Sequence, residues 1–165
     1  MLWAAFGPVY VGLSCLAILW LRDDSEPGLH GVLWLLGVVW AADSGAYAAG
    51  RLIGGPKLLP VVSPNKTWAG LGGAVGAGAG IGFALAIWLE ARSPALGALA
   101  GVLVGIVEQL GDLLESAVKR RFAVKDTSAL IPGHGGLLDR VDGLMLASLL
   151  LAAAALARGG SVLTW

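Results

Sequence analysis

Five long apolar stretches constrain this chain of 165 residues more than any other feature. A helix of about 20 apolar residues crosses a bilayer, and none of the five stretches alternates polar and apolar residues as barrel strands do. We therefore predict an all-α, polytopic membrane helical bundle with about five transmembrane helices, forming one integral membrane domain over residues 1–165. The predicted spans are Leu2–Leu21, Leu29–Gly50, Gly70–Leu89, Ala95–Gly111 and Leu144–Ala157.

Composition supports a membrane protein. Charged residues make up 13% of the chain, about half the share of a typical soluble domain. The formal net charge is zero, which argues against a nucleic-acid binder that relies on a basic surface. Cys15 is the single cysteine, so a disulfide framework is excluded. No Lys or Arg precedes the first apolar stretch, so we predict a retained span and not a cleaved signal peptide.

The basic residues indicate an orientation. Eight of the eleven lie in two connectors, residues 51–68 and 112–142, which five spans would place on the same side of the membrane. Because cytoplasmic loops are enriched in Lys and Arg, we predict that both connectors face the cytoplasm. The N-terminus would then lie inside and the C-terminus outside.

The third predicted span contains a stripe of small residues. Gly72, Gly76 and Gly80 recur every four residues, a spacing that lets helix backbones approach closely. We expect packing within the chain or between the subunits of a homodimer. A phosphate-binding loop is disfavoured because the stretch lacks a Gly-Lys-Ser/Thr ending.

Polar residues continue from the fourth span into the second connector. Their spacing of i, i+3, i+4, i+7 and i+8 places them on one helical face. A solvated face with ion pairs is the simplest interpretation, but this face emerges directly from the membrane boundary. The five residues are Asp112, Glu115, Ser116, Lys119 and Arg120.

A second polar cluster follows in the same connector. Glycines flank His134 and would let backbone amides approach a ligand, although a lone histidine more often makes a hydrogen bond within its loop. Asp139 and Asp142 are spaced to share a helical face. Carboxylates next to Lys and Arg, without a Cys/His metal set, suit Mg²⁺ and phosphate groups.

The first connector shows the same chemistry. Asp43 lies near the end of the second span, and an acid within a span is functional by default. The segment Ser63–Trp68 has two interpretations that the sequence does not separate. It is either a capped helix start, with Ser or Asn as the cap, or a phosphate loop built on Ser63, Lys66 and Thr67.

These motifs resemble a known family. The residues 116–120, 125–126 and 132–142 (SAVKR, KD and PGHGGLLDRVD) resemble the signature of phosphatidate cytidylyltransferases, also called CDP-diacylglycerol synthases. The stretches DSGAY at 43–47 and SPNKTW at 63–68 are similar too. The resemblance covers about residues 34–165. Ala69 departs from it, because many members carry an acid there. Typical members also have further spans before this region, so the chain resembles their C-terminal catalytic portion or a short member.

The resemblance implies an activity and a set of site residues. Members of the family make CDP-diacylglycerol and pyrophosphate from CTP and phosphatidate with Mg²⁺, at the cytoplasmic face of a membrane. A monovalent cation is expected to share the metal centre. The resemblance implies metal ligands at Asp112, Asp139 and Asp142, and catalytic roles for these three with Lys119 and Arg120. The expected substrate-binding residues are Asp43, Ser63, Lys66, Thr67, Ser116, Lys125, Asp126, His134 and Arg140.

Two other functions are alternatives to this activity. A CDP-alcohol phosphotransferase is disfavoured because its Asp-Gly-x-x-Ala-Arg motif is absent. A non-catalytic membrane subunit or transporter could bind anionic lipid headgroups through the basic connectors. Lipid binding alone would not require the acids at 112, 139 and 142, which weaken it.

Overall fold

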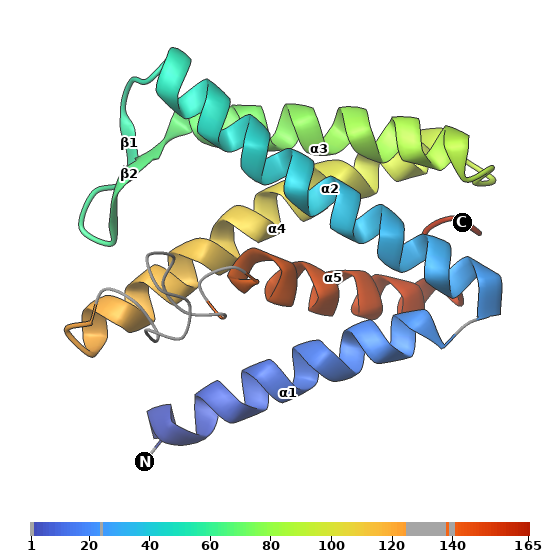
Figure 1. Cartoon of the computed structure of the whole chain (residues 1–165), viewed down its shortest axis with the longest axis horizontal. Coiled ribbons are helices and arrows are strands. Elements are labelled where there is room, and N and C mark those ends of the chain that lie inside the picture. The colour runs from blue at the N-terminus through green and yellow to red at the C-terminus, as the bar shows by residue number, and fades with distance from the viewer. Residues whose placement is uncertain (1, 24, 125–137, 139–140) are drawn as a thin grey trace, which may run out of the picture.

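A computed structural model describes residues 2–23, 25–124, 138 and 141–165 of the chain. It contains five helices and a short hairpin (Figure 1). The prediction of a helical bundle is confirmed, while the two-stranded sheet was not expected. The elements are α1 (Leu2–Arg22), α2 (Ser25–Leu52), β1 (Lys57–Leu59), β2 (Ser63–Thr67), α3 (Trp68–Trp88), α4 (Pro94–Arg121) and α5 (Asp142–Arg158).

Among the described residues, three helices are long and apolar enough to cross a membrane, namely α3, α4 and the Pro27–Leu52 part of α2. Helix α1 has a shorter apolar part at Phe6–Arg22, and α5 is 17 residues long. Helix α4 continues ten residues beyond Gly111, as the polar face of the second connector predicted.

Small residues set how closely α3 approaches its neighbours. Its buried positions are Gly70, Ala74, Gly78, Gly82 and Ala86. A Cβ added at Gly78 would lie 2.6 Å from the carbonyl oxygen of Gly101 in α4. Only glycine permits this backbone contact, so the spacing of α3 and α4 depends on it.

The predicted stripe is a different one. A Cβ added at Gly72, Gly76 or Gly80 would meet no described atom within 4 Å. Of the two alternatives predicted for this stripe, packing within the chain is therefore wrong for the described residues, and packing between subunits stays a prediction. Both stripes have a period of four residues, so the sequence did not distinguish the packed face from the open one.

The core lies where α1, α2, α4 and α5 meet. Trp34 of α2 is fully buried, and its indole Nε1 donates a hydrogen bond to the carbonyl oxygen of Gly82, at 2.9 Å. This bond satisfies the one polar group of a large side chain in an apolar environment. It also fixes α2 against α3.

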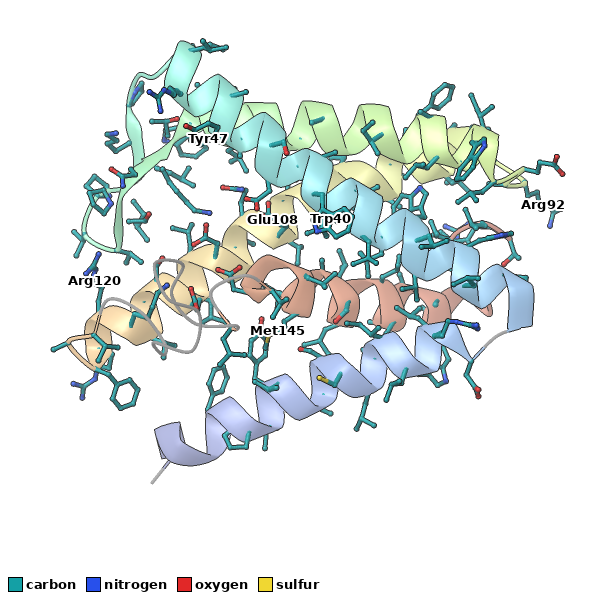
Figure 2. All side chains as sticks on the ribbon, in the orientation of Figure 1. Trp40, Tyr47, Arg92, Glu108, Arg120 and Met145 are labelled. Atoms are coloured by element: carbon teal, nitrogen blue, oxygen red, sulfur yellow. The ribbon has the colours of Figure 1, made fainter. Side chains whose placement is uncertain are left out.

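The described residues of the polar connectors gather at one end of the bundle. Figure 1 shows the hairpin, the end of α4 and the start of α5 at the same end, and the α3–α4 turn at the other. Tyr47 and Arg120 lie at the hairpin end and Arg92 at the opposite end (Figure 2). The described residues of both connectors therefore lie at one end of the bundle.

Candidate functional site

The hairpin places Lys66 over the polar end of α4. Positive φ angles at Gly54 (67°) and Gly55 (92°) let the chain leave α2 and enter β1, a backbone conformation that glycine adopts readily. β2 then pairs antiparallel with β1, with Lys57 opposite Thr67. The Lys66 ammonium reaches α4, where it lies 2.6 Å from Asp112 Oδ2.

The segment Ser63–Trp68 combines parts of both predicted interpretations. Helix α3 is capped, but the cap is Thr67, whose Oγ1 accepts a hydrogen bond from the Gly70 amide at 3.0 Å. The prediction of Ser or Asn as the cap is wrong, because α3 begins at Trp68 and the residue directly before it is Thr67, while Ser63 and Asn65 lie further back in β2. Because the backbone of β2 is extended up to Thr67, the helix begins only after this residue. The preceding Lys66 points toward the acids of α4.

Three carboxylates come together beside Lys66. Asp112, Glu115 and Asp142 each offer one oxygen, and these oxygens all lie within 4.8 Å of one another. Asp112 and Glu115 are three residues apart in α4, so they share a face, and α5 begins at Asp142 directly opposite. The cluster could hold a divalent metal ion, since hard oxygen donors suit such ions.

The pKa of Asp142 is raised, which shows that its surroundings in this cluster disfavour the ionised form. Burial and the neighbouring Asp112 raise it from 3.8 to about 6. The Gly143 amide, which donates to Asp142 Oδ1 at 2.8 Å, lowers it together with the Glu115 hydrogen bond and Lys119. A carboxyl among other acids resists ionisation unless a cation neutralises the group.

The remaining polar face of α4 surrounds the cluster. Lys119 lies 2.6 Å from Glu115 Oε2, and Ser116 Oγ donates to Asp112 Oδ1 at 3.4 Å. Arg120 is exposed. The single face predicted for these residues therefore brings Ser116 and Lys119 to the acids, with Arg120 at the exposed end of α4.

A pocket of about 520 Å³ opens beside the Lys66–Asp112 pair. Asp43 and Arg51 line it from α2, and Arg51 Nη1 donates to the Tyr47 hydroxyl at 2.8 Å. The pocket thus carries both positive and negative side chains from elements far apart in sequence. Its lining residues are Asp43, Ala46, Tyr47, Gly50, Arg51, Asn65, Lys66, Thr67, Gln109 and Asp112. Ser63, which was predicted to bind substrate, does not line the pocket.

Five predicted site residues lie outside the described residues. They are Lys125, Asp126, His134, Asp139 and Arg140. Their predicted roles stay predictions, including the metal-binding role of Asp139.

Several described residues at the site were not predicted. Glu115 joins the acid cluster although the metal prediction named Asp112, Asp139 and Asp142; its place on the same face as Asp112 was the available signal. Gln109 contacts Lys66 and Glu108 contacts Gln109, yet both lie in a largely apolar stretch. The Tyr10 hydroxyl of α1 is buried, without a hydrogen-bond partner among the described residues, and interacts electrostatically with Asp142 and Glu115.

Tyr10 reaches the site because α1 and α5 run parallel. Ser148 of α5 donates to the Ser14 carbonyl at 3.4 Å, so Tyr10, one turn earlier in α1, is level with the first turn of α5. Side chains tilt toward the N-terminus of their helix. The phenol therefore extends toward Asp142.

Together these groups bring negative and positive side chains to one end of the bundle. The acid cluster supplies negative charge, while Lys66, Arg51 and Lys119 supply positive charge around it. Such a combination can hold phosphate groups and a metal ion together.

Comparison with known proteins gives consistent matches. The model of the cytidylyltransferase family matches residues 1–157, which includes α1 and so begins before residue 34. The phosphatidate cytidylyltransferase of Brucella suis biovar 1 (strain 1330) is 49% identical over 150 residues, covering 90% of this chain and 55% of the relative.

Two further relatives with the same name are more distant. That of Staphylococcus haemolyticus (strain JCSC1435) is 43% identical over 144 residues, covering 82% of this chain and 52% of the relative. That of Mycobacterium bovis (strain ATCC BAA-935 / AF2122/97) is 42% identical over 120 residues, covering 73% and 39%. The chain spans about half the length of the first two relatives and less of the third.

Proposed function

Because the chain belongs to the cytidylyltransferase family, we propose that it acts as a CTP:phosphatidate cytidylyltransferase, which makes CDP-diacylglycerol and pyrophosphate for phospholipid biosynthesis. The observation that carries the proposal is the Lys66–Asp112 pair, at 2.6 Å, between the acid cluster and the polar pocket. The pocket offers cationic side chains for CTP phosphates, and the acids suit a metal ion.

The reaction needs charge neutralisation more than a protein base. A phosphate monoester has a second pKa near 6, so phosphatidate is largely a dianion at neutral pH. One of its oxygens attacks the α-phosphorus of CTP, a new P–O bond forms, and the bond to the β-phosphate breaks. The electron pair leaves with pyrophosphate. The obstacle is the meeting of two anions, which positioning and fixed positive charge overcome.

The residues of this chain divide these tasks. Asp112, Glu115 and Asp142 would hold Mg²⁺, with a monovalent cation sharing the centre and Asp139 as a further ligand. The bound metal ion would neutralise phosphate oxygens as pyrophosphate leaves. Lys66 and Arg51 would bind and orient the triphosphate in the pocket.

The remaining basic groups would face the lipid phosphate or the nucleotide. In this role we place Lys119 and Arg120 of α4, with Lys125 and Arg140 of the second connector. Ser116 would orient Asp112 through its hydroxyl.

We further propose a location in the cell inner membrane with the site facing the cytoplasm. The two connectors carry eight of the eleven basic residues, and their described residues lie at one end of the bundle, which supports this orientation under the positive-inside rule. Phosphatidate would remain in the bilayer and present its headgroup at that end.

A homodimer remains a prediction. The open stripe of Gly72, Gly76 and Gly80 is compatible with a second copy of the chain. Cross-linking in detergent at several protein concentrations would test it.

Pyrophosphate release in detergent tests the proposed function. CTP and phosphatidate are added together and singly, with and without Mg²⁺. Release only with both substrates and Mg²⁺ is expected. Binding of phosphatidate without any release would support a non-catalytic lipid-binding subunit and refute the enzyme.

A further inference from the structure

Two polar side chains are buried in α4 with no role in the proposed chemistry. Glu108 is 3% exposed and Gln109 is 5% exposed, and the other buried residues of α4 are apolar or glycine. Polar side chains inside a membrane helix are costly and usually functional. Figure 2 shows Glu108 in the interior of the bundle, between α4 and α2.

The two side chains form a chain of hydrogen bonds that ends at Lys66. The Lys66 ammonium donates to Gln109 Oε1 at 2.8 Å, and the Gln109 backbone oxygen is a second acceptor at 3.4 Å. Gln109 Nε2 donates to Glu108 Oε2 at 2.8 Å. The Gln109 amide therefore uses its oxygen for the lysine and its nitrogen for the glutamate.

Glu108 determines the direction of that amide. An amide group has donors at one end and acceptors at the other, so a carboxylate at one end requires the nitrogen there. The oxygen must then face Lys66. Without Glu108, a rotated amide would present N–H groups to the ammonium and repel it.

Glu108 is itself held in place by the start of α5. A Cβ added at Gly143 would lie 2.7 Å from Glu108 Cγ and 3.0 Å from Oε1. The glutamate therefore packs against the backbone next to Asp142. The network connects the α5 side of the site with the lysine on β2.

We propose that Glu108 and Gln109 are positioning residues that hold the Lys66 ammonium beside Asp112 and in the wall of the pocket before the nucleotide arrives. The assignment to CTP rests on the proposed function, while the positioning of Lys66 does not. A lysine has a long and flexible side chain. If the position of its charge is fixed in advance, less side-chain conformational entropy is lost when a triphosphate binds.

Four variants test the proposal. Gln109→Leu removes the acceptor for Lys66, and Glu108→Leu removes the group that orients the amide. Glu108→Gln keeps a side-chain oxygen that can accept from Gln109, so it serves as the conservative variant. Trp34→Phe is the matched control, because it removes a buried hydrogen bond between helices without touching the site.

The first measurement needs no substrate. The rate of acetylation of Lys66 in detergent is measured by mass spectrometry relative to Lys57, which is exposed on β1. Loss of one charge-assisted hydrogen bond is expected to raise the Lys66 rate about threefold or more in Gln109→Leu and Glu108→Leu. Glu108→Gln and Trp34→Phe are expected to remain within about twofold of the parent, as for sites outside the network.

The second measurement is the KM of each substrate. Gln109→Leu is expected to raise the KM for CTP about tenfold, the effect of one strong hydrogen bond to a charged group. The KM for phosphatidate should change by less than about twofold. This comparison serves as a control, because a general loss of the folded structure would change the KM of both substrates. Glu108→Gln should have the same KM for CTP as the parent.

The outcomes separate the two proposals. An unchanged Lys66 rate in Gln109→Leu, or the same change in Trp34→Phe, would overturn the positioning role. If the parent releases no pyrophosphate, the proposed function fails, but the Lys66 rates still decide the positioning role. If Gln109→Leu does not fold, a difference between Glu108→Leu and Glu108→Gln supports the role, and equal rates in these two refute it.

Discussion

Replacing single glycines of α3 by alanine should separate its packed face from its open face. Gly78 lies between Gly76 and Gly80 on the same helix. All three substitutions add one methyl group and gain the same helix propensity. They differ only in what the new methyl group meets.

The structure gives the expected magnitudes. At Gly78 the added carbon would lie 2.6 Å from the Gly101 carbonyl oxygen, against 3.4 Å for an ordinary contact. The backbones of α3 and α4 must therefore separate by about 0.8 Å. Overpacking of this kind costs about 1–3 kcal/mol, which offsets or exceeds the roughly 1 kcal/mol that alanine gains over glycine in a helix. At Gly76 and Gly80 an added methyl group meets open space, so only the gain in helix propensity remains.

Denaturation in detergent, followed by circular dichroism, measures the free energy of unfolding of the three variants and the parent. Gly78→Ala is expected to be destabilised by up to about 2 kcal/mol net. Gly76→Ala and Gly80→Ala should be as stable as the parent or more so. Equal destabilisation of all three would show that the Gly72, Gly76 and Gly80 face is also packed, and would refute the reasoning.

Three further predictions concern the site. Asp112→Asn should reduce pyrophosphate release at least about 100-fold, because it removes an acid of the cluster and the partner of Lys66; membrane insertion should be unaffected, and wild-type-like rates would remove the metal assignment. The raised pKa of Asp142, about 6, means that the folded protein binds a proton more tightly than the unfolded chain. The stabilisation from this proton binding is thus fully present at a pH below 3.8, the ordinary pKa of the carboxyl, and is lost as the pH rises through about 6. Without metal, this loss should be visible in denaturation curves and absent from Asp142→Asn, and retention of the same pH dependence would contradict it. Tyr10→Phe should raise the free energy of unfolding by about 1 kcal/mol, because the buried hydroxyl has no hydrogen-bond partner among the described residues and such a group is costly. Destabilisation in the same denaturation assay would show that the hydroxyl is bonded.

Most of the helical architecture could be predicted from local pattern. Apolar stretches of nearly 20 residues have few alternatives to a membrane helix, and the spacing of Asp112, Glu115, Ser116 and Lys119 is sufficient to place them on one face. The hairpin was missed because β1 and β2 are three and five residues long and lie in a segment rich in Pro and Gly. Such short strands form through pairing with each other, which the sequence pattern hardly records.

The chain by itself determined where membrane helices form and which charged residues lie together at their ends, because both follow from hydropathy and helical period. The tertiary structure alone decided which glycine stripe is packed, because Gly72–Gly76–Gly80 and Gly70–Ala74–Gly78–Gly82 have the same period. It alone brought Lys66 of β2 into contact with Asp112. It also placed Asp142, at the start of α5, beside Glu115. It also revealed Glu108 and Gln109 as partners of the site, since a contact between residues 43 positions apart depends on how helices pack and not on local spacing.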